Sequence, residues 1–357
     1  MSKSIDDFAA QRLRGLLEWQ RGRTSAVTIG AGKYGKVYLC GANLDAVMKE
    51  TWTKGEKAAA CKQAFREHVV ALFQTLLVLD GQAPHLPLHY GCCIEARAGG
   101  MLGQMYMERF EGSLEKMGTA CLVTAEDWLG LAFQLMHSIV VLSELLDLSH
   151  NDAYPRNVLI SPSVQVGAVT YEVTGETYRV PWRGFAALTD FGIASSVALL
   201  GRRSAPEVAD RLKPSPSSAS FGDVPPTKHI LRYSELPVFS RDAYTILKWI
   251  RFPTQSLPPA PDGVRLWASS SLRLLDETQD ALARPCGLKA AFHSIFAPEW
   301  LKRHELPSFA APGGEAVDFA LCGDVAYKVS LFARAERGLA GLPLTSRSAF
   351  SFASSSR

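Results

Sequence analysis

Two short apolar stretches, each joined directly to polar residues, constrain most strongly what this chain can fold into. The first, Val158 to Ile160, follows a loop from His150 to Asn157 that reads His-Asn-Asp-Ala-Tyr-Pro-Arg-Asn. The second, Phe185 to Leu188, is followed by Asp190-Phe191-Gly192. Either motif alone is compatible with an ordinary turn after a strand, because Asn, Asp, Pro and Gly are the usual turn formers. Both motifs in this order, with suitable partners upstream, favour a shared functional site.

The residue types at these two points predict metal-dependent phosphoryl transfer. The carboxylate of Asp152 can orient an attacking hydroxyl, and the amide oxygen of Asn157 can hold a metal ion on the phosphates. A strand that ends just before Asp190 would bring a second carboxylate to the same ion. We therefore expect a magnesium site that includes Asn157 and Asp190.

A glycine-rich hairpin is predicted over residues 27–39, where β-branched and aromatic residues flank three glycines. Glycine lets backbone amides approach phosphate closely, so we expect a nucleotide to contact Gly30, Gly32, Gly35 and the neighbouring Val37. The same glycine spacing marks dinucleotide-binding folds. In those folds a helix follows the glycines, whereas here a strand follows, so the dinucleotide interpretation fails.

Lys49 ends a third predicted strand, shortly after the glycine hairpin. A lysine among apolar neighbours often faces solvent, but this position favours a contact with the phosphates. A helix is predicted over residues 57–79, and within it Glu67 lies 18 positions after Lys49 (67 − 49), a spacing suitable for an ion pair. A solvated surface carboxylate is the alternative. The helix is expected to bury an apolar face made of Phe65, Val69, Leu72, Phe73 and Leu76.

Further strands are expected around residues 89–95 and 103–110. The second of them ends in Met-Tyr-Met-Glu-Arg-Phe, which changes from apolar to polar as a hinge would. There the backbone groups of Glu108 and Phe110 would face an adenine, and Met107 would set the depth of the pocket.

The remaining segments have simpler predictions. A helix over residues 125–148 is rich in Leu, Val, Phe and Ile and should be a buried support for the polar loop. Residues 163–183 contain an extended hairpin, and residues 5–20 a short amphipathic helix. Residues 202–226 are rich in Ser and Pro, which predicts a mobile segment, and the Ser-rich end from Ser346 is expected to be disordered.

Composition excludes several classes of protein. A net charge of +3 and 47% apolar residues indicate a globular protein whose main partner is not nucleic acid. The seven cysteines form no Cys-x-x-Cys motif, which is typical of reduced thiols in a cytoplasmic or nuclear compartment. The first residues lack the apolar core of a secretory signal. The longest apolar run is interrupted by Gln134, His137 and Glu144, so no membrane span is expected.

Together these motifs resemble the protein kinase family from about Val27 to about Ile250. The most similar members are divergent serine/threonine kinases of large DNA viruses, which also carry His-Asn-Asp and an extra hairpin before Asp-Phe-Gly. The resemblance implies an α+β, two-lobed fold with a small β-rich N-lobe and a larger helical C-lobe. It places the N-lobe at 23–110 and the C-lobe at 111–303, with extensions at 1–22 and 304–357. A viral protein of this kind would act in the host cell.

The resemblance also implies residue roles. Lys49 would hold the α and β phosphates of ATP and pair with Glu67. Asp152 would be the catalytic base, and magnesium would be bound by Asn157 and Asp190. Asp242 resembles the buried helix aspartate that anchors the catalytic loop in this family.

Two departures from the family pattern bear on mechanism. Asn151 stands where most protein kinases have an arginine that pairs with a phosphorylated activation segment, so activity independent of that phosphorylation is expected. Tyr154 stands where serine/threonine kinases usually have a lysine near the γ-phosphate. Arg156 is the only cationic side chain between Asp152 and Asn157, so we expect it to act as a catalytic cation; contact with the acceptor protein alone is the alternative.

The implied activity is transfer of the γ-phosphoryl group of ATP to protein serine or threonine hydroxyls, with Mg²⁺ as cofactor. A small-molecule kinase of the choline-kinase type is one alternative, but such enzymes typically lack the glycine loop and the Asp-Phe-Gly. A pseudokinase that only binds partners is another. It is disfavoured because the chain retains Lys49, Asp152, Asn157 and Asp190.

Overall fold

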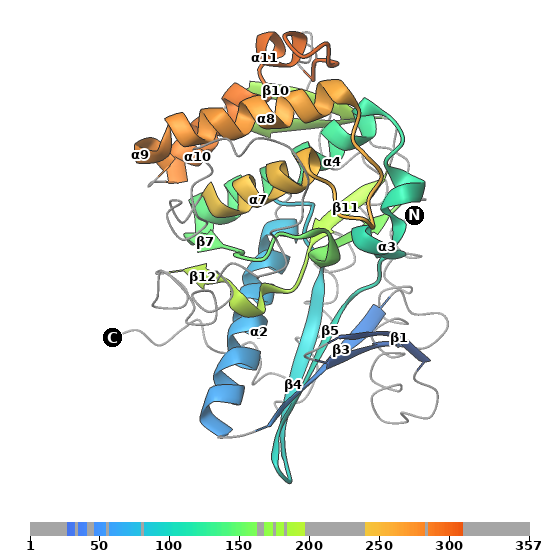
Figure 1. The fold of residues 1–357 in the computed structure, drawn as a ribbon. Coiled ribbons are helices and arrows are strands. Elements are labelled where there is room, and N and C mark those ends of the chain that lie inside the picture. Colours follow the sequence, from blue (N-terminus) through green and yellow to red (C-terminus); the bar gives the residue numbers. More distant parts are fainter. Residues whose placement is uncertain are drawn as a thin grey trace, which may run out of the picture. The chain divides into compact units, whose positions relative to one another are not determined.

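A computed structural model describes residues 27–32, 35–40, 46–54, 57–79, 82–162, 168–173, 176–181, 184–196, 240–282 and 285–309. These residues form a mixed α+β protein with two compact units, divided between Phe110 and Glu111 (Figure 1). The predicted helix at 5–20, the segment 202–226 and the Ser-rich end lie outside the described residues.

The first unit contains an antiparallel sheet of five strands in the order β1-β2-β3-β5-β4. Its strands are β1 (Val27–Gly32), β2 (Gly35–Leu39), β3 (Ala46–Lys54), β4 (His89–Arg97) and β5 (Gly100–Glu108). The glycine-rich hairpin is confirmed, because β1 and β2 pair in antiparallel register and Gly32 lies opposite Gly35. β2 then pairs with β3, which places Lys49 opposite Val37.

Helix α2 (Lys57–Leu79) packs against β3, β4 and β5, and its bounds agree with the prediction. The predicted apolar face is wrong at Phe73 and Leu76, whereas Val69 and Leu72 are half-buried and the side chain of Phe65 lies outside the described residues. Phe73 and Leu76 are 37% and 46% exposed, whereas Val70 and Val78 are buried, as is the carboxylate-bearing Glu67. The helix is therefore rotated so that the side carrying Glu67 faces the sheet.

The second unit combines helices with three small antiparallel sheets. The helices are α3 (Leu114–Cys121), α4 (Ala125–Leu146), α7 (Ser240–Arg251), α8 (Asp262–Glu277), α9 (Gln279–Leu282), α10 (Pro285–Ile295) and α11 (Pro298–Lys302), with 3-10 turns η1 (Pro155–Asn157) and η2 (Phe191–Ile193). The strands are β6 (Gly112–Ser113), β7 (Leu148–Ser149), β8 (Val158–Ser161), β9 (Ala168–Val173), β10 (Glu176–Pro181), β11 (Phe185–Leu188) and β12 (Ser195–Ser196). They pair in the orders β11-β8-β6, β10-β9 and β12-β7.

Helix α4 is the central element of the second unit and contacts α7, α10, β7, β10 and β11. A capping box starts it, since the Thr124 hydroxyl accepts the Asp127 N–H and the Asp127 carboxylate accepts the Thr124 N–H. By length and composition α4 could cross a membrane, but 83% of its most apolar window is buried inside the protein. The same test is passed by core helices of soluble proteins, which agrees with the predicted supporting role.

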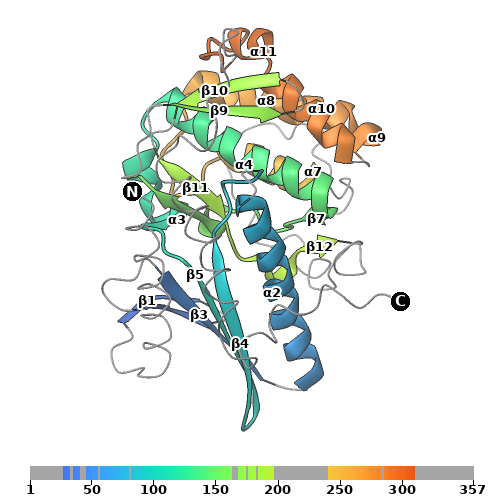
Figure 2. The ribbon, with the colours of Figure 1, turned by 180° about the vertical axis from the view of Figure 1, so that it is seen from behind.

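The predicted hairpin insertion is present as β9 and β10, which lie along α4 in Figure 2. The backbones approach closely, because a Cβ added at Gly130 would lie 3.1 Å from the carbonyl oxygen of Pro181. A buried aromatic cluster fills the rest of the contact, with Phe133 of α4 at its centre; its other rings come from Tyr171, Tyr178, Phe292, Phe296 and Phe309. The hairpin is therefore part of the hydrophobic core of this unit.

The hairpin is also linked to α10 by polar groups. The Tyr178 hydroxyl lies 2.8 Å from the Glu176 carboxylate and 2.7 Å from Nδ1 of His293.

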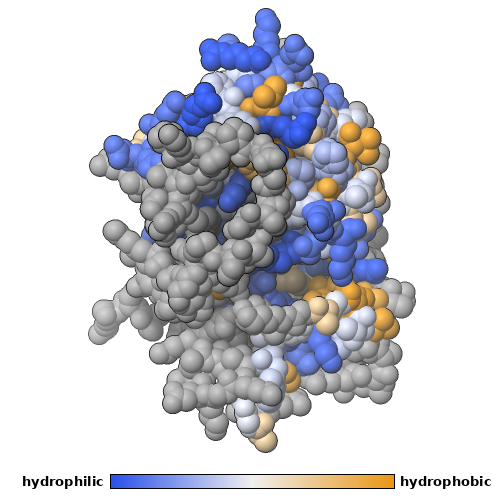
Figure 3. All heavy atoms as spheres, viewed as in Figure 1, coloured by the Kyte–Doolittle hydropathy of each residue, from blue (hydrophilic) through white to orange (hydrophobic). Residues whose placement is uncertain are grey.

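On the face drawn in Figure 3 the hydrophobic residues of the described part form small groups between hydrophilic ones. Small, separated apolar groups of this kind are ordinary for a protein surface. The cysteines with described side chains are present as thiols: Cys40, Cys92, Cys93, Cys121 and Cys286.

His137 provides a test of this core through its pH dependence. Its ring is buried and stacks on Phe133, its Nδ1 has no hydrogen-bond partner in the described part of the chain, and burial lowers its pKa to about 4. In the unfolded chain the imidazole of His137 therefore takes up a proton near pH 6.5, whereas in the folded protein it does so only near pH 4. The free energy of unfolding thus decreases as the pH falls from about 6.5 towards 4. Between pH 7 and 5, the free energy of unfolding of His137→Leu should fall by about 1–2 kcal/mol less than that of the wild type, as measured by urea unfolding. Equal losses of unfolding free energy in the two proteins would show that burial does not lower the pKa of His137.

Candidate active site

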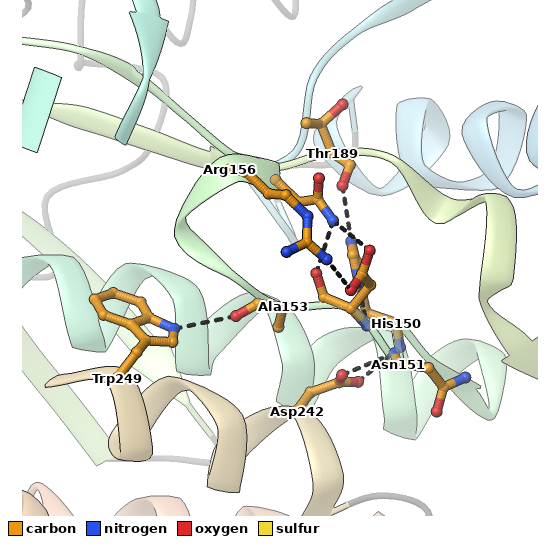
Figure 4. Close-up of polar contacts among 9 residues, drawn as sticks. His150, Asn151, Ala153, Arg156, Thr189, Asp242 and Trp249 are labelled. Carbon is orange, nitrogen blue, oxygen red and sulfur yellow. Dashed lines mark hydrogen bonds and ion pairs between the residues drawn. The ribbon is translucent and has the colours of Figure 1, made fainter. Parts of the chain in front are cut away.

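Helix α7 holds the His150–Asn157 loop from two points (Figure 4). The buried carboxylate of Asp242 accepts the backbone N–H groups of His150 and Asn151, at 2.6 and 2.8 Å. This confirms the predicted anchoring contact. Two helical turns later, Nε1 of Trp249 donates to the carbonyl oxygen of Ala153 at 3.1 Å. Sequence reasoning missed Trp249, although its seven-residue spacing from Asp242 (249 − 242) places both on one helix face.

His150 joins this loop to the segment that contains Asp190. Its Nε2 lies 2.8 Å from the carbonyl oxygen of Thr189, and its Nδ1 lies 3.1 Å from the backbone N–H of Asp152. Because a carbonyl only accepts and an N–H only donates, these partners assign the neutral tautomer with hydrogen on Nε2. The ring also packs edge-on against Phe191 at 4.3 Å. The histidine is therefore a structural link between the two motifs.

The Asp152 carboxylate is held by two side chains of its own loop. Asn157 Nδ2 donates to Oδ2 and to the backbone carbonyl of Asp152, each at 2.8 Å. Arg156 donates to Oδ1 at 2.6 Å, and its guanidinium lies 4.8 Å from the centre of the Tyr154 ring. The sequence predicted all three residues at one site, and the structure brings them together. The direct Arg156–Asp152 ion pair was not foreseen.

Asn157 and Asp190 are neighbours because β8 and β11 pair. Leu188 lies opposite Val158, and the Thr189 N–H donates to the Asn157 carbonyl at 2.9 Å. Asp190 follows at once and adopts the left-handed backbone conformation, with φ of 66°.

The donor chemistry at this point fits a magnesium ion. Since Asp152 occupies the amide nitrogen of Asn157, the amide oxygen of Asn157 is the atom left for a cation, and Asp190 supplies a carboxylate. Among the described residues no group of three or more His, Cys, Asp or Glu side chains is placed to hold a metal ion. Mg²⁺ commonly takes one or two protein ligands and completes its shell with phosphates and water.

In the first unit, the predicted ion pair is present. Nζ of Lys49 lies 2.6 Å from Oε1 of Glu67, and both side chains are largely buried. Glycine is required at Gly35 for a structural reason, because an added Cβ would overlap the backbone carbonyl of Glu50 on β3. At Gly30 an added Cβ would make only ordinary contact with Val37, so packing does not explain this glycine. The surroundings of Gly32 are not among those that the structure describes.

The predicted adenine-binding segment ends β5. Glu108 is buried, its backbone N–H donates to the Leu88 carbonyl at 2.9 Å, and its carboxylate accepts the Leu88 N–H at 3.2 Å. The N–H of Glu108 is therefore used within the protein, so it is not the backbone group that would meet a ligand. Phe110 is also buried.

Asp242 is the contact whose loss should disturb the loop most. Burial raises the pKa of this carboxyl, while the two backbone N–H donors, of His150 and Asn151, act in the opposite direction. Asp242→Asn replaces one acceptor oxygen by an NH₂ group that faces an N–H, so we expect about 2–3 kcal/mol lower unfolding free energy, measured by urea denaturation. Asp262→Asn, at an exposed carboxylate that pairs with Arg265, is the matched control and should change little. Equal effects would show that Asp242 is no anchor.

Two comparisons with known proteins bear on this site. No protein-family model matches the sequence, and no curated protein matches it significantly. The assignment of a function therefore depends on the geometry of the two motifs and on the Lys49–Glu67 pair.

Proposed function

We propose that this protein is an ATP-dependent protein kinase with a two-lobed fold, which transfers the γ-phosphoryl group to serine or threonine hydroxyls. One observation carries the proposal: Asn157 is hydrogen-bonded to Asp152, and the paired strands β8 and β11 bring the backbone that leads into Asp190 next to Asn157. Phosphoryl transfer requires a residue that orients the acceptor hydroxyl and oxygen ligands for the metal on the phosphates. The buried Lys49–Glu67 pair supports the same activity, because such a pair fixes a lysine for the phosphates.

The loop geometry suggests how the residues divide the work. Asn157 orients Asp152 by holding Oδ2, so the carboxylate has one defined rotamer before the acceptor arrives. Arg156 holds Oδ1 and must shift when a hydroxyl takes its place. The Arg156 side chain is 49% exposed, so it has room to turn towards the transferred phosphoryl group. Magnesium, held by Asn157 and Asp190, would neutralise charge on the phosphates.

The direct test is incubation of the purified protein with labelled ATP, Mg²⁺ and a mixed protein substrate, followed by phosphoamino-acid analysis. Label on serine or threonine is expected. Label on tyrosine would change the acceptor class, and label on choline alone, in a parallel incubation with choline, would favour the choline-kinase type. Nucleotide binding without transfer would favour a pseudokinase and overturn the proposal.

Lys49→Met and Asp190→Asn should each abolish measurable transfer and leave the folded state intact, because each removes a group that acts on the nucleotide or its metal. Circular dichroism and thermal unfolding check the fold. Lys289→Met is the matched control, since Lys289 also forms a lysine–glutamate pair, with Glu144 at 2.9 Å in the second unit. Wild-type turnover in either Lys49→Met or Asp190→Asn would refute the site assignment.

Arg156→Ala should lower turnover by about two orders of magnitude with little change in ATP affinity, the scale seen when one oriented donor to a charged transition state is lost. Arg265→Ala is the control, because Arg265 is equally exposed, at 48%, and pairs with a carboxylate on the surface of α8. If Arg156 only contacts the acceptor protein, the Michaelis constant for that protein rises while turnover at saturation stays unchanged. That result would remove Arg156 from the catalytic residues.

A further inference from the structure

Asn151 lies buried near the start of the polar loop, and its side chain has no role in the transfer described above. Its backbone is in the left-handed region, with φ of 64°, which asparagine tolerates better than most residues. Its backbone N–H is fixed by Asp242. The backbone at Asn151 is therefore held by the loop anchor on α7 (Figure 4).

The amide nitrogen of Asn151 reaches across to the chain that follows Asp190. Nδ2 lies 2.9 Å from the Ser195 hydroxyl, 3.2 Å from the Ile193 carbonyl and 3.3 Å from the Ser149 carbonyl. Two of these partners are carbonyl oxygens, which only accept, so the nitrogen and oxygen of the amide are assigned by their surroundings. The amide oxygen is buried without a hydrogen-bond partner among the described residues, so the donor side fixes this orientation.

The backbone pairing at this point is too short to fix the segment alone. β7 and β12 each have two residues, with Ser195 opposite Ser149 and Ser196 opposite Leu148. The Ser196 hydroxyl adds one bond to the Leu146 carbonyl at 2.8 Å. Isolated two-stranded pairs are marginal, so side-chain hydrogen bonds decide whether residues 193–196 stay in place. A hydrogen bond between buried uncharged groups also does not depend on a phosphate.

We infer that Asn151 is a positioning residue that fixes the start of the segment after Asp190 against the catalytic loop, with no need for phosphorylation. The inference rests on the proposed kinase function, since its purpose is to hold Asp190 in register with Asp152. Arginine at this position would bring a buried charge that needs an anionic partner. The neutral amide of Asn151 instead donates hydrogen bonds to the Ser195 hydroxyl and the Ile193 carbonyl. These acceptors belong to the chain itself and are present without phosphorylation.

Two variants test the inference, each chosen to leave the backbone undisturbed. Asn151→Gly removes the amide and keeps the left-handed conformation accessible. Ser195→Ala removes one partner. Ser143→Ala is the control, since its buried hydroxyl bonds the Val140 carbonyl within α4 and links no second segment. Turnover and backbone hydrogen exchange of residues 193–196 are measured in each variant and in the double variant, together with thermal unfolding.

Asn151→Gly should lower turnover and speed exchange at residues 193–196 by about tenfold each, with a smaller effect in the same direction for Ser195→Ala. The double variant should equal Asn151→Gly within about twofold, because both changes break one link. Phosphatase-treated wild type should keep its rate. Unchanged exchange in Asn151→Gly, multiplicative losses in the double variant, or inactivation by phosphatase would each overturn the inference. If the wild type transfers no phosphate, the proposed function falls, whereas the exchange data still decide whether Asn151 holds the segment.

Discussion

The second unit depends on one buried carboxylate, that of Asp242. It satisfies two consecutive backbone N–H groups at the start of the polar loop, which would otherwise be buried without acceptors. With its entry fixed there and the Ala153 carbonyl fixed by Trp249, the loop can present Asp152 and Asn157 in one orientation. The loop itself has no regular structure beyond a single 3-10 turn, so these contacts from α7 replace the rigidity that a helix or strand would supply.

The strand pair β8–β11 adds the second constraint. Antiparallel pairing places the residue before one strand beside the residues after the other, and this is why Asn157 and Asp190 come together although the hairpin β9–β10 separates them in sequence. The hairpin is accommodated without disturbing the pair because it packs on α4 through the cluster around Phe133. The hairpin therefore contributes to the hydrophobic core of this unit.

Local patterns predicted much of this structure from the sequence. The bounds of α2, the glycine hairpin and the Lys49–Glu67 pair followed from periodicity, turn residues and spacing. The buried face of α2 did not, because the stripe with Phe73 and Leu76 is the more apolar one by sequence. The helix instead turns Glu67 inward, where it forms the buried ion pair with Lys49.

Long-range polar contacts were beyond the reach of sequence patterns. Trp249 bonds a carbonyl 96 positions away, and Asn151 bonds Ser195 across 44 positions. Tryptophan in an apolar helix and asparagine in a loop are both ordinary residues, and only the folded chain brings them to these partners. The departure at Asn151 was visible in the sequence, but its hydrogen-bond partners were not. The same holds for the hydrogen bond by which Arg156 engages Asp152.

The most direct measurement of the central claim is single-turnover transfer by Asp152→Asn. This change keeps the shape of the side chain and removes the charge that should orient the acceptor hydroxyl. The account predicts that wild-type protein transfers the γ-phosphoryl group of ATP to a protein hydroxyl. In the variant, transfer should fall by at least about two orders of magnitude, the scale of lost general-base catalysis, while Mg²⁺-dependent ATP binding stays within a few-fold. Undiminished transfer by the variant, or none by the wild type with ATP bound, would contradict it.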